Sequence, residues 1–95
     1  IYDCLSPSAN AVKPAGQWNR YTITCRDNKI HVVLNNVSII DMDLNQWTQA
    51  GKNPDGSPNK FTIAYKDMAR DGLIGLQYHG HPIWFRNIRI KQLEQ

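Results

Sequence analysis

The chain has 95 residues, of which 41% are hydrophobic and 20% are charged, and its formal net charge at pH 7 is +3. A chain of this length forms one small domain at most, and it holds no run of about 18 apolar residues that could span a membrane. The excess of positive charge is too small and too scattered for a nucleic-acid-binding surface, which would cluster Lys and Arg.

The N-terminus and the cysteines say little about compartment. The first ten residues, IYDCLSPSAN, have neither the basic region nor the apolar stretch of a signal peptide. They lack an initiator Met and begin on a strand-like pattern, so we expect the chain to start inside a larger domain. Cys4 and Cys25 do not have the spacing of a structural zinc site. A disulfide between them and two separate thiols both remain open.

The first half of the chain predicts a small sheet. Residues 6–17, rich in Ser, Pro, Ala and Gly, predict an irregular loop. Two runs of apolar residues then alternate with polar ones, the period of a strand with one buried face: Tyr21, Ile23 and Cys25, then Ile30, Val32 and Leu34. Asp27-Asn28 and Asn35-Asn36 are typical of tight turns. With residues 37–41 the pattern predicts a three-stranded antiparallel meander.

The middle of the chain changes period. Residues 42–60 form a long connection with Asn-Pro, Asp-Gly and Ser-Pro turn signals. The apolar residues that follow recur at helical spacing: Phe61, Ala64, Tyr65 and Met68. Ser57 suits the cap of a helix, Pro58 its first turn, and Gly72 a position just past its end. The sequence therefore predicts one short helix over residues 58–70.

Two more strands are predicted near the C-terminus, over residues 73–78 and 83–91, on either side of a turn at residues 79–82. Antiparallel strands, one short helix and long loops indicate an all-β fold that is part of a β-sandwich. A sandwich needs a facing sheet, and this sequence does not contain an obvious one. We therefore expect half a domain, with the remainder in another segment or chain.

Four stretches, in this order and spacing, resemble the 3-keto-disaccharide hydrolase domain family: PAGQWNRYTI, KIHVVLNNVSIIDMDL, KNPDGSPNKF and RDGLIGLQYHGHPIWFRNIRIKQL. The resemblance runs from about Tyr2 to Leu93. It implies a concanavalin A or laminin G type of antiparallel β-sandwich, a jelly roll, with residues 1–95 as the C-terminal half. Members of the family are often exported, which implies a periplasmic or secreted location.

The chain departs from the family pattern at two positions. The family commonly has LQDHG, and here Tyr78 replaces the acid beside His79. If that acid orients the histidine or holds a cation, the role is vacant or filled from elsewhere. Asn36 replaces a Gly that is common in the turn, which is harmless because Asn also tolerates positive φ.

The resemblance implies cleavage of the glycosidic bond of 3-keto-glycosides. A ketone at C3 of a hexose acidifies the proton on C2, and a base that removes it allows the enolate to expel the group at C1. Such an elimination, with water added later, differs from the two-carboxylate route of ordinary glycosidases. It requires a base, donors or a metal for the enolate oxygen, and a flat surface for the sugar ring.

His79 and Arg86 are the candidate catalytic residues. His79 follows a predicted strand and suits a general base or a metal ligand; the alternative is an imidazole that bonds backbone at a tight turn. His81 lies two residues on, as a substrate-binding candidate, and we expect Gly80 to break the face that the two histidines would share. Arg86 suits a sugar hydroxyl or the enolate oxygen.

Gln77, Trp84 and Trp47 complete the substrate-binding candidates. Trp84 is either a core residue or a sugar platform, and Trp47 either plugs the long loop onto the sheet or lines a carbohydrate cleft. No cofactor is required with certainty. A divalent metal is an option, but two histidines need carboxylates as well, from Asp41 and Asp43 or from outside the chain.

Three classes of function stay open. The sequence has no GxSxG elbow, P-loop, dinucleotide fingerprint or HExxH, so nothing supports a serine hydrolase, kinase, dehydrogenase or zinc protease. An enzyme acting on 3-keto-sugars is the main hypothesis. A non-catalytic carbohydrate-binding module is the alternative, and it should survive the loss of His79. An interaction domain should expose an apolar patch without a polar cleft.

Overall fold

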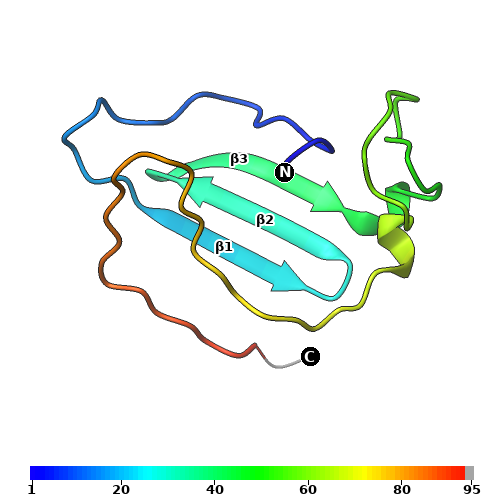
Figure 1. Ribbon diagram of the computed structural model, residues 1–95. Coiled ribbons are helices and arrows are strands. Elements are labelled where there is room, and N and C mark those ends of the chain that lie inside the picture. Colours follow the sequence, from blue (N-terminus) through cyan, green and yellow to red (C-terminus); the bar gives the residue numbers. More distant parts are fainter. Residues whose placement is uncertain (94–95) are drawn as a thin grey trace.

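The computed structural model describes residues 1–93. Its regular structure is an antiparallel sheet of three strands in the order β1 (Tyr21–Arg26), β2 (Lys29–Leu34) and β3 (Val37–Asp43) (Figure 1). Two single 3-10 turns follow, η1 (Leu44–Gln46) and η2 (Tyr65–Asp67). Within the described residues, no helix is long and apolar enough to cross a membrane. The predicted meander and the all-β fold class are confirmed.

The tight turns of the sheet depend on residues with left-handed backbone conformation. Asp27 has a φ of 54°, and Asn35 and Asn36 have φ values of 51° and 68°. Asn and Asp adopt positive φ more readily than other residues that carry a Cβ. Positive φ at both central residues of a two-residue turn matches the twist of the flanking strands. Both predicted turns are confirmed.

The pairing of β2 with β3 contains a bulge. The register shifts between Val32 and Val33, which leaves Ile39 of β3 opposite no residue. The carbonyl of Ile39 instead accepts a hydrogen bond of 2.9 Å from the amide of Ser8. Ile39 and its neighbour Ile40 are both buried. The bulge thus ties the N-terminal segment to the sheet.

The core lies over β2 and β3 and leaves β1 uncovered. Its buried side chains are Cys4, Val32, Leu34, Ile39, Ile40, Met42 and Trp47. Tyr21 and Ile23 of β1 lie opposite Leu34 and Val32 and so share their face of the sheet. They are nevertheless 58% and 63% exposed. One strand therefore presents an apolar face to solvent.

The predicted helix over residues 58–70 is wrong. In that range only η2 is helical, and it is a single 3-10 turn. Pro58 pairs with Lys52 in an isolated β-bridge, and the amide of Asn59 donates to the carbonyl of Gly51 at 2.9 Å. The backbone where the helix should begin is thus held in an extended loop.

The helical spacing was a correct signal for burial but not for backbone conformation. Ala64 is buried, and Phe61 and Tyr65 pack against the core with their ring centroids 5.4 Å apart. An extended stretch followed by one 3-10 turn brings these side chains to the core as well as a helix would. Four apolar residues in a short segment do not distinguish the two.

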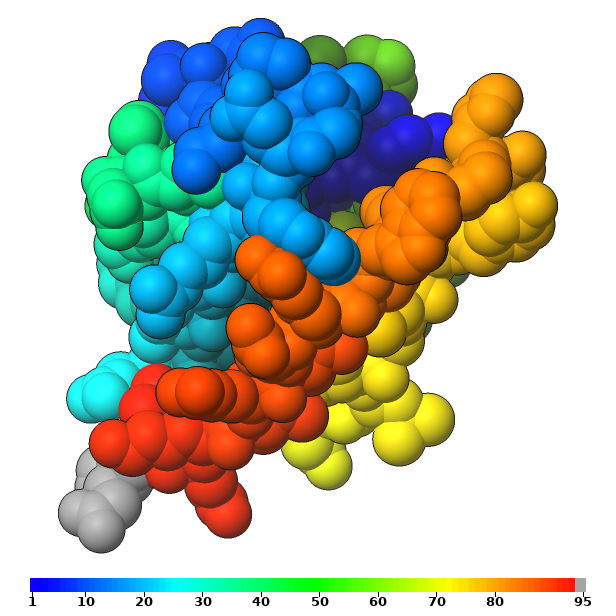
Figure 2. All heavy atoms as spheres, turned by 90° about the vertical axis from the view of Figure 1, so that its left-hand side faces the viewer, coloured from blue at the N-terminus to red at the C-terminus, as the bar shows by residue number. Residues whose placement is uncertain are grey.

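The strands predicted over residues 73–78 and 83–91 are absent. The C-terminal segment, residues 72–93, lies in no strand and makes no backbone hydrogen bond to any other part of residues 1–93. The orange and red residues of this segment run over the outside of the molecule (Figure 2). A strand needs a neighbour for its N–H and C=O groups, so alternation alone does not form one. Gly80 and Asn87, with φ values of 90° and 55°, also interrupt the extended backbone.

Residues 1–93 therefore provide three of the predicted strands and a single sheet. The second sheet of a sandwich, the jelly-roll order and the assignment of residues 1–95 to the C-terminal half of one domain stay predictions.

The two cysteines are separate thiols in this structure. Cys4 is buried in the core and Cys25 is exposed on β1. Tyr65 lies beside Cys4, and burial, together with a hydrogen bond to Cys4, raises the pKa of Tyr65 to about 12.

Candidate functional site

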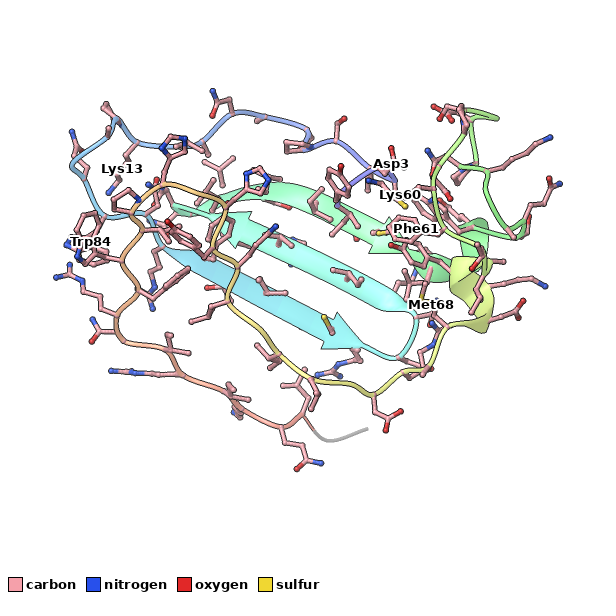
Figure 3. All side chains as sticks on the ribbon, viewed as in Figure 1. Asp3, Lys13, Lys60, Phe61, Met68 and Trp84 are labelled. Carbon is pink, nitrogen blue, oxygen red and sulfur yellow. The ribbon has the colours of Figure 1, made fainter. Side chains whose placement is uncertain are left out.

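The C-terminal segment carries most of the candidate site residues on an exposed stretch of chain: Gln77, His79, His81, Trp84 and Arg86. Trp84 is 73% exposed, so it is not a core residue in the part of the chain that the structure describes. Figure 3 places Trp84 near Lys13, at the end of the sheet opposite Lys60 and Phe61. Trp84 thus lies at one end of the sheet.

His79 and His81 flank a sharp change of backbone direction. Gly80 between them has a φ of 90°, which residues with a Cβ rarely adopt. The face that two histidines at this spacing would share on a strand is not formed, as expected. Neither ring has a hydrogen-bond partner in the described part of the chain, whereas Nε2 of His31 lies 2.9 Å from Oγ of Ser38. The alternative in which the His79 imidazole bonds backbone at a tight turn is therefore not seen within residues 1–93.

Arg86 stacks on Trp18, a residue that the sequence reasoning did not single out. The guanidinium carbon lies 4.0 Å from the centre of the indole ring, the arrangement of a cation–π contact. Residues 1–93 contain one salt bridge, between Lys29 and Asp43, and Arg86 has no part in it. The local sequence held no signal for this contact, because the two residues lie far apart in the chain.

Trp47 is a core residue. Its side chain is 4% exposed, and its Nε1 donates a hydrogen bond of 3.0 Å to Oδ1 of Asn53. The indole therefore packs the long loop onto the sheet and does not line a cleft. The structure does not bring Trp47 together with the candidates of the C-terminal segment.

The acidic candidates for a metal site are not gathered around the histidines. Asp43 accepts hydrogen bonds from Nδ2 of Asn28 at 2.7 Å, the amide of Asn45 at 2.9 Å and Nζ of Lys29 at 3.1 Å. These three bonds, in that order, hold the pKa of Asp43 below its ordinary value. Asp41 is exposed on β3. Among residues 1–93, no three His, Cys, Asp or Glu side chains lie close enough together to hold a metal ion.

The surface has two shallow hollows away from the candidates. One, of about 300 Å³, lies in the loop after η1 and is lined by Gln46, Thr48, Gln49, Lys52, Asn53, Pro54 and Gly56. The other, of about 290 Å³, lies under the N-terminal segment beside Leu34 and Ile39. None of the candidate residues lines either hollow. Apart from the buried Trp47, the catalytic and substrate-binding candidates are exposed in this part of the chain.

Comparison with known proteins matches nearly all of the chain to one domain family. Residues 1–91 match the 3-keto-alpha-glucoside-1,2-lyase-like domain family. A 3-keto-disaccharide hydrolase from Bacteroides thetaiotaomicron is 29% identical over 102 residues, which cover 99% of this chain and 35% of that protein.

One crystal structure has a similar fold. It is of a proposed glycosyl hydrolase from Parabacteroides distasonis and matches with a TM-score of 0.68 and 34% sequence identity, over 72% of this chain and 36% of that one. The chain thus spans about a third of the length of each of these two relatives.

Proposed function

The chain belongs to the 3-keto-alpha-glucoside-1,2-lyase-like domain family, and on that basis we propose that it is part of a domain that cleaves the glycosidic bond of 3-keto-glycosides. The observation that carries the proposal is the family match over residues 1–91, which includes every candidate site residue. A relative named 3-keto-disaccharide hydrolase, aligned with 99% of the chain, supports it.

The proposal includes a second part of the domain. The exposed apolar face of β1 and the unpaired C-terminal segment are what a facing sheet would cover in a β-sandwich. We propose that another segment or chain supplies that sheet and, with it, the opposite wall of the site.

The proposed reaction is an elimination with His79 as the base. His79 takes the proton from C2, and the electron pair of that C–H bond forms an enolate whose negative charge lies on the C3 oxygen. As the enolate collapses, a C1–C2 double bond forms and the C1–O bond breaks with its electrons on the leaving oxygen, which then takes up a proton. Addition of water to C1 and return of a proton to C2 complete a net hydrolysis. His79 is exposed and has no partner in residues 1–93, so its imidazole is accessible to a substrate.

The other exposed candidates suit the remaining roles. Arg86 can donate to the C3 oxygen, where negative charge develops as C2 loses its proton. The Trp84 ring offers a flat face for a sugar, and Gln77 and His81 can bind hydroxyl groups. Trp47 is left out of the proposed site because its ring is buried in the core.

A carbohydrate-binding module without catalysis is the second candidate. It is favoured by Tyr78, which stands where the family commonly has an acid beside the histidine. Tyr78 is 72% exposed, close in sequence to the exposed ring of Trp84. Aromatic faces and amides are sufficient to bind a glycan, and they need no base.

Turnover of a 3-keto-glucoside separates the two functions. The full-length wild type is compared with His79→Ala, each with EDTA and with an added divalent metal. Loss of turnover in folded His79→Ala supports the enzyme and the role of His79, and His31→Gln is the matched control, since His31 bonds Ser38 within the sheet. If the wild type binds the glucoside but never cleaves it, the binding module is correct.

A further inference from the structure

The contact between Trp18 and Arg86 joins two distant segments. The guanidinium lies 4.0 Å from the ring centre of an indole that is 45% exposed. Within residues 1–93, no hydrogen bond or salt bridge engages the Arg86 side chain. The indole therefore holds the positive charge by its ring face without using any of the five N–H donors of the guanidinium.

Within residues 1–93, the backbone around Arg86 has no partner that would hold it in place. The C-terminal segment makes no backbone hydrogen bond to another part of the described chain. A long side chain on such a segment would sample many rotamers in solvent. Within residues 1–93, the stack on Trp18 is the side-chain contact that limits this freedom.

The loop that carries Trp18 is, in contrast, held firmly to the sheet by one side chain. Nδ2 of Asn35 donates to Oδ1 of Asn19 and to the carbonyl of Ala11, both at 2.8 Å. Oδ1 of Asn35 accepts from the amide of Arg20 at 2.9 Å. Asn35 belongs to the turn between β2 and β3, so the sheet fixes the two residues that follow Trp18.

We propose that Trp18 is a positioning residue that holds Arg86 with its N–H edge toward an oxygen of the substrate. This inference rests on the function proposed above, and in a 3-keto-sugar the oxygen is the one on C3. The guanidinium lies over the indole with its carbon 4.0 Å from the ring centre, and its planar N–H donors stay free, so a single oxygen can accept one or two of them. As C2 loses its proton, the charge on that oxygen grows and the bond strengthens.

A double-mutant cycle tests the proposal. The kcat and KM of the full-length protein on methyl 3-keto-α-glucoside are measured for wild type, Trp18→Ala, Arg86→Gln and the double variant. We expect Trp18→Ala to lower kcat by about 10- to 100-fold, as a misplaced catalytic group does, with a smaller change in KM. Trp18→Phe should restore most of the rate because it keeps a ring face. In the Arg86→Gln background, Trp18→Ala should have no further effect.

Other outcomes are equally decisive. If Trp18→Ala lowers kcat/KM by the same factor with and without Arg86, its role is structural and the proposal is overturned. Trp18→Leu, which keeps apolar bulk but has no ring, gives the same comparison if the alanine variant does not fold. If the wild type binds the glucoside without cleaving it, the proposed cleavage is wrong, and the same double-mutant cycle is measured on Kd. Coupling between the two substitutions in Kd supports the role of Trp18, whereas additive effects on Kd refute it. A wild type that neither cleaves nor binds overturns both proposals.

Discussion

Nε1 of Trp47 donates a hydrogen bond of 3.0 Å to Oδ1 of Asn53, which ties the buried indole to the loop that follows it. The same oxygen accepts from Nδ2 of Asn59 at 2.9 Å, and Nδ2 of Asn53 donates to the carbonyl of Asp3 at 3.0 Å. One amide side chain thus joins the core, the 51–60 loop and the N-terminal segment.

Substitution of Asn53 should therefore be costly. In Asn53→Ala the Trp47 donor loses its partner inside the core, and an unsatisfied buried group costs about 1–3 kcal/mol. We expect the free energy of unfolding, measured by urea titration, to fall by about 2 kcal/mol. Asn45→Ala is the control, because the Asn45 side chain is exposed. Equal effects of the two substitutions would show that the Asn53 network does not stabilise the fold.

Two tryptophans should respond in opposite ways to truncation. Trp47→Ala removes a buried indole and should lower the free energy of unfolding by about 3–5 kcal/mol. Trp84→Ala removes an exposed one and should change it by less than about 0.5 kcal/mol. If the proposed site is correct, Trp84→Ala should instead weaken glucoside binding, by roughly 3- to 10-fold in Kd for the loss of one aromatic face. Calorimetric titration and urea unfolding of the same samples check both, and a stable Trp47→Ala would contradict the core assignment.

Asp43 should make stability depend on pH in the acid range. Its pKa is lowered in the folded protein from an ordinary value of 3.8, so in that window the unfolded chain binds more protons. The stabilisation from Asp43 is therefore complete above pH 3.8 and is lost as the pH falls through the lower, folded pKa. Asp43→Asn should flatten the pH dependence of unfolding in this window. A wild-type slope in Asp43→Asn would refute the assignment.

The two thiols should differ in reactivity. Cys25 is exposed on β1, while Cys4 is buried in the core. In the folded chain of residues 1–95, a maleimide should therefore modify Cys25, and Cys4 only as the chain unfolds. In the full-length protein the proposed facing sheet should protect Cys25 as well, and mass spectrometry of digested samples checks both. Cys25→Ser should abolish the fast reaction. Modification of both thiols at the same rate would mean that the N-terminal segment does not close over the sheet.

Local signals in the sequence were sufficient for the sheet. The alternation from Tyr21 to Leu34 set which residues share a face, and Asp27 and the Asn35-Asn36 pair supplied the positive φ that two tight turns require. Each of these preferences acts over a few residues, so no distant contact was needed to predict the meander.

The predictions of the helix and of the last two strands were wrong because the backbone conformation of these segments depends on contacts with distant parts of the chain. Phe61, Ala64 and Tyr65 reach the core from a loop that Asn53 and Lys52 hold in extended form. Residues 73–91 have the composition of strands, but a strand forms only beside another that accepts its hydrogen bonds. A periodic pattern reports which residues prefer burial and leaves the backbone undecided.

The sequence by itself determined the family, the three-stranded sheet with its turns, and the candidate residues of the proposed site. The tertiary structure alone decided that Trp47 is core and Trp84 is exposed, since both are indoles in ambiguous contexts and only packing separates them. It also decided that Arg86 meets Trp18. That contact joins residues far apart in the chain, and a cation–π contact leaves no local pattern in sequence because its geometry depends on how two segments fold together.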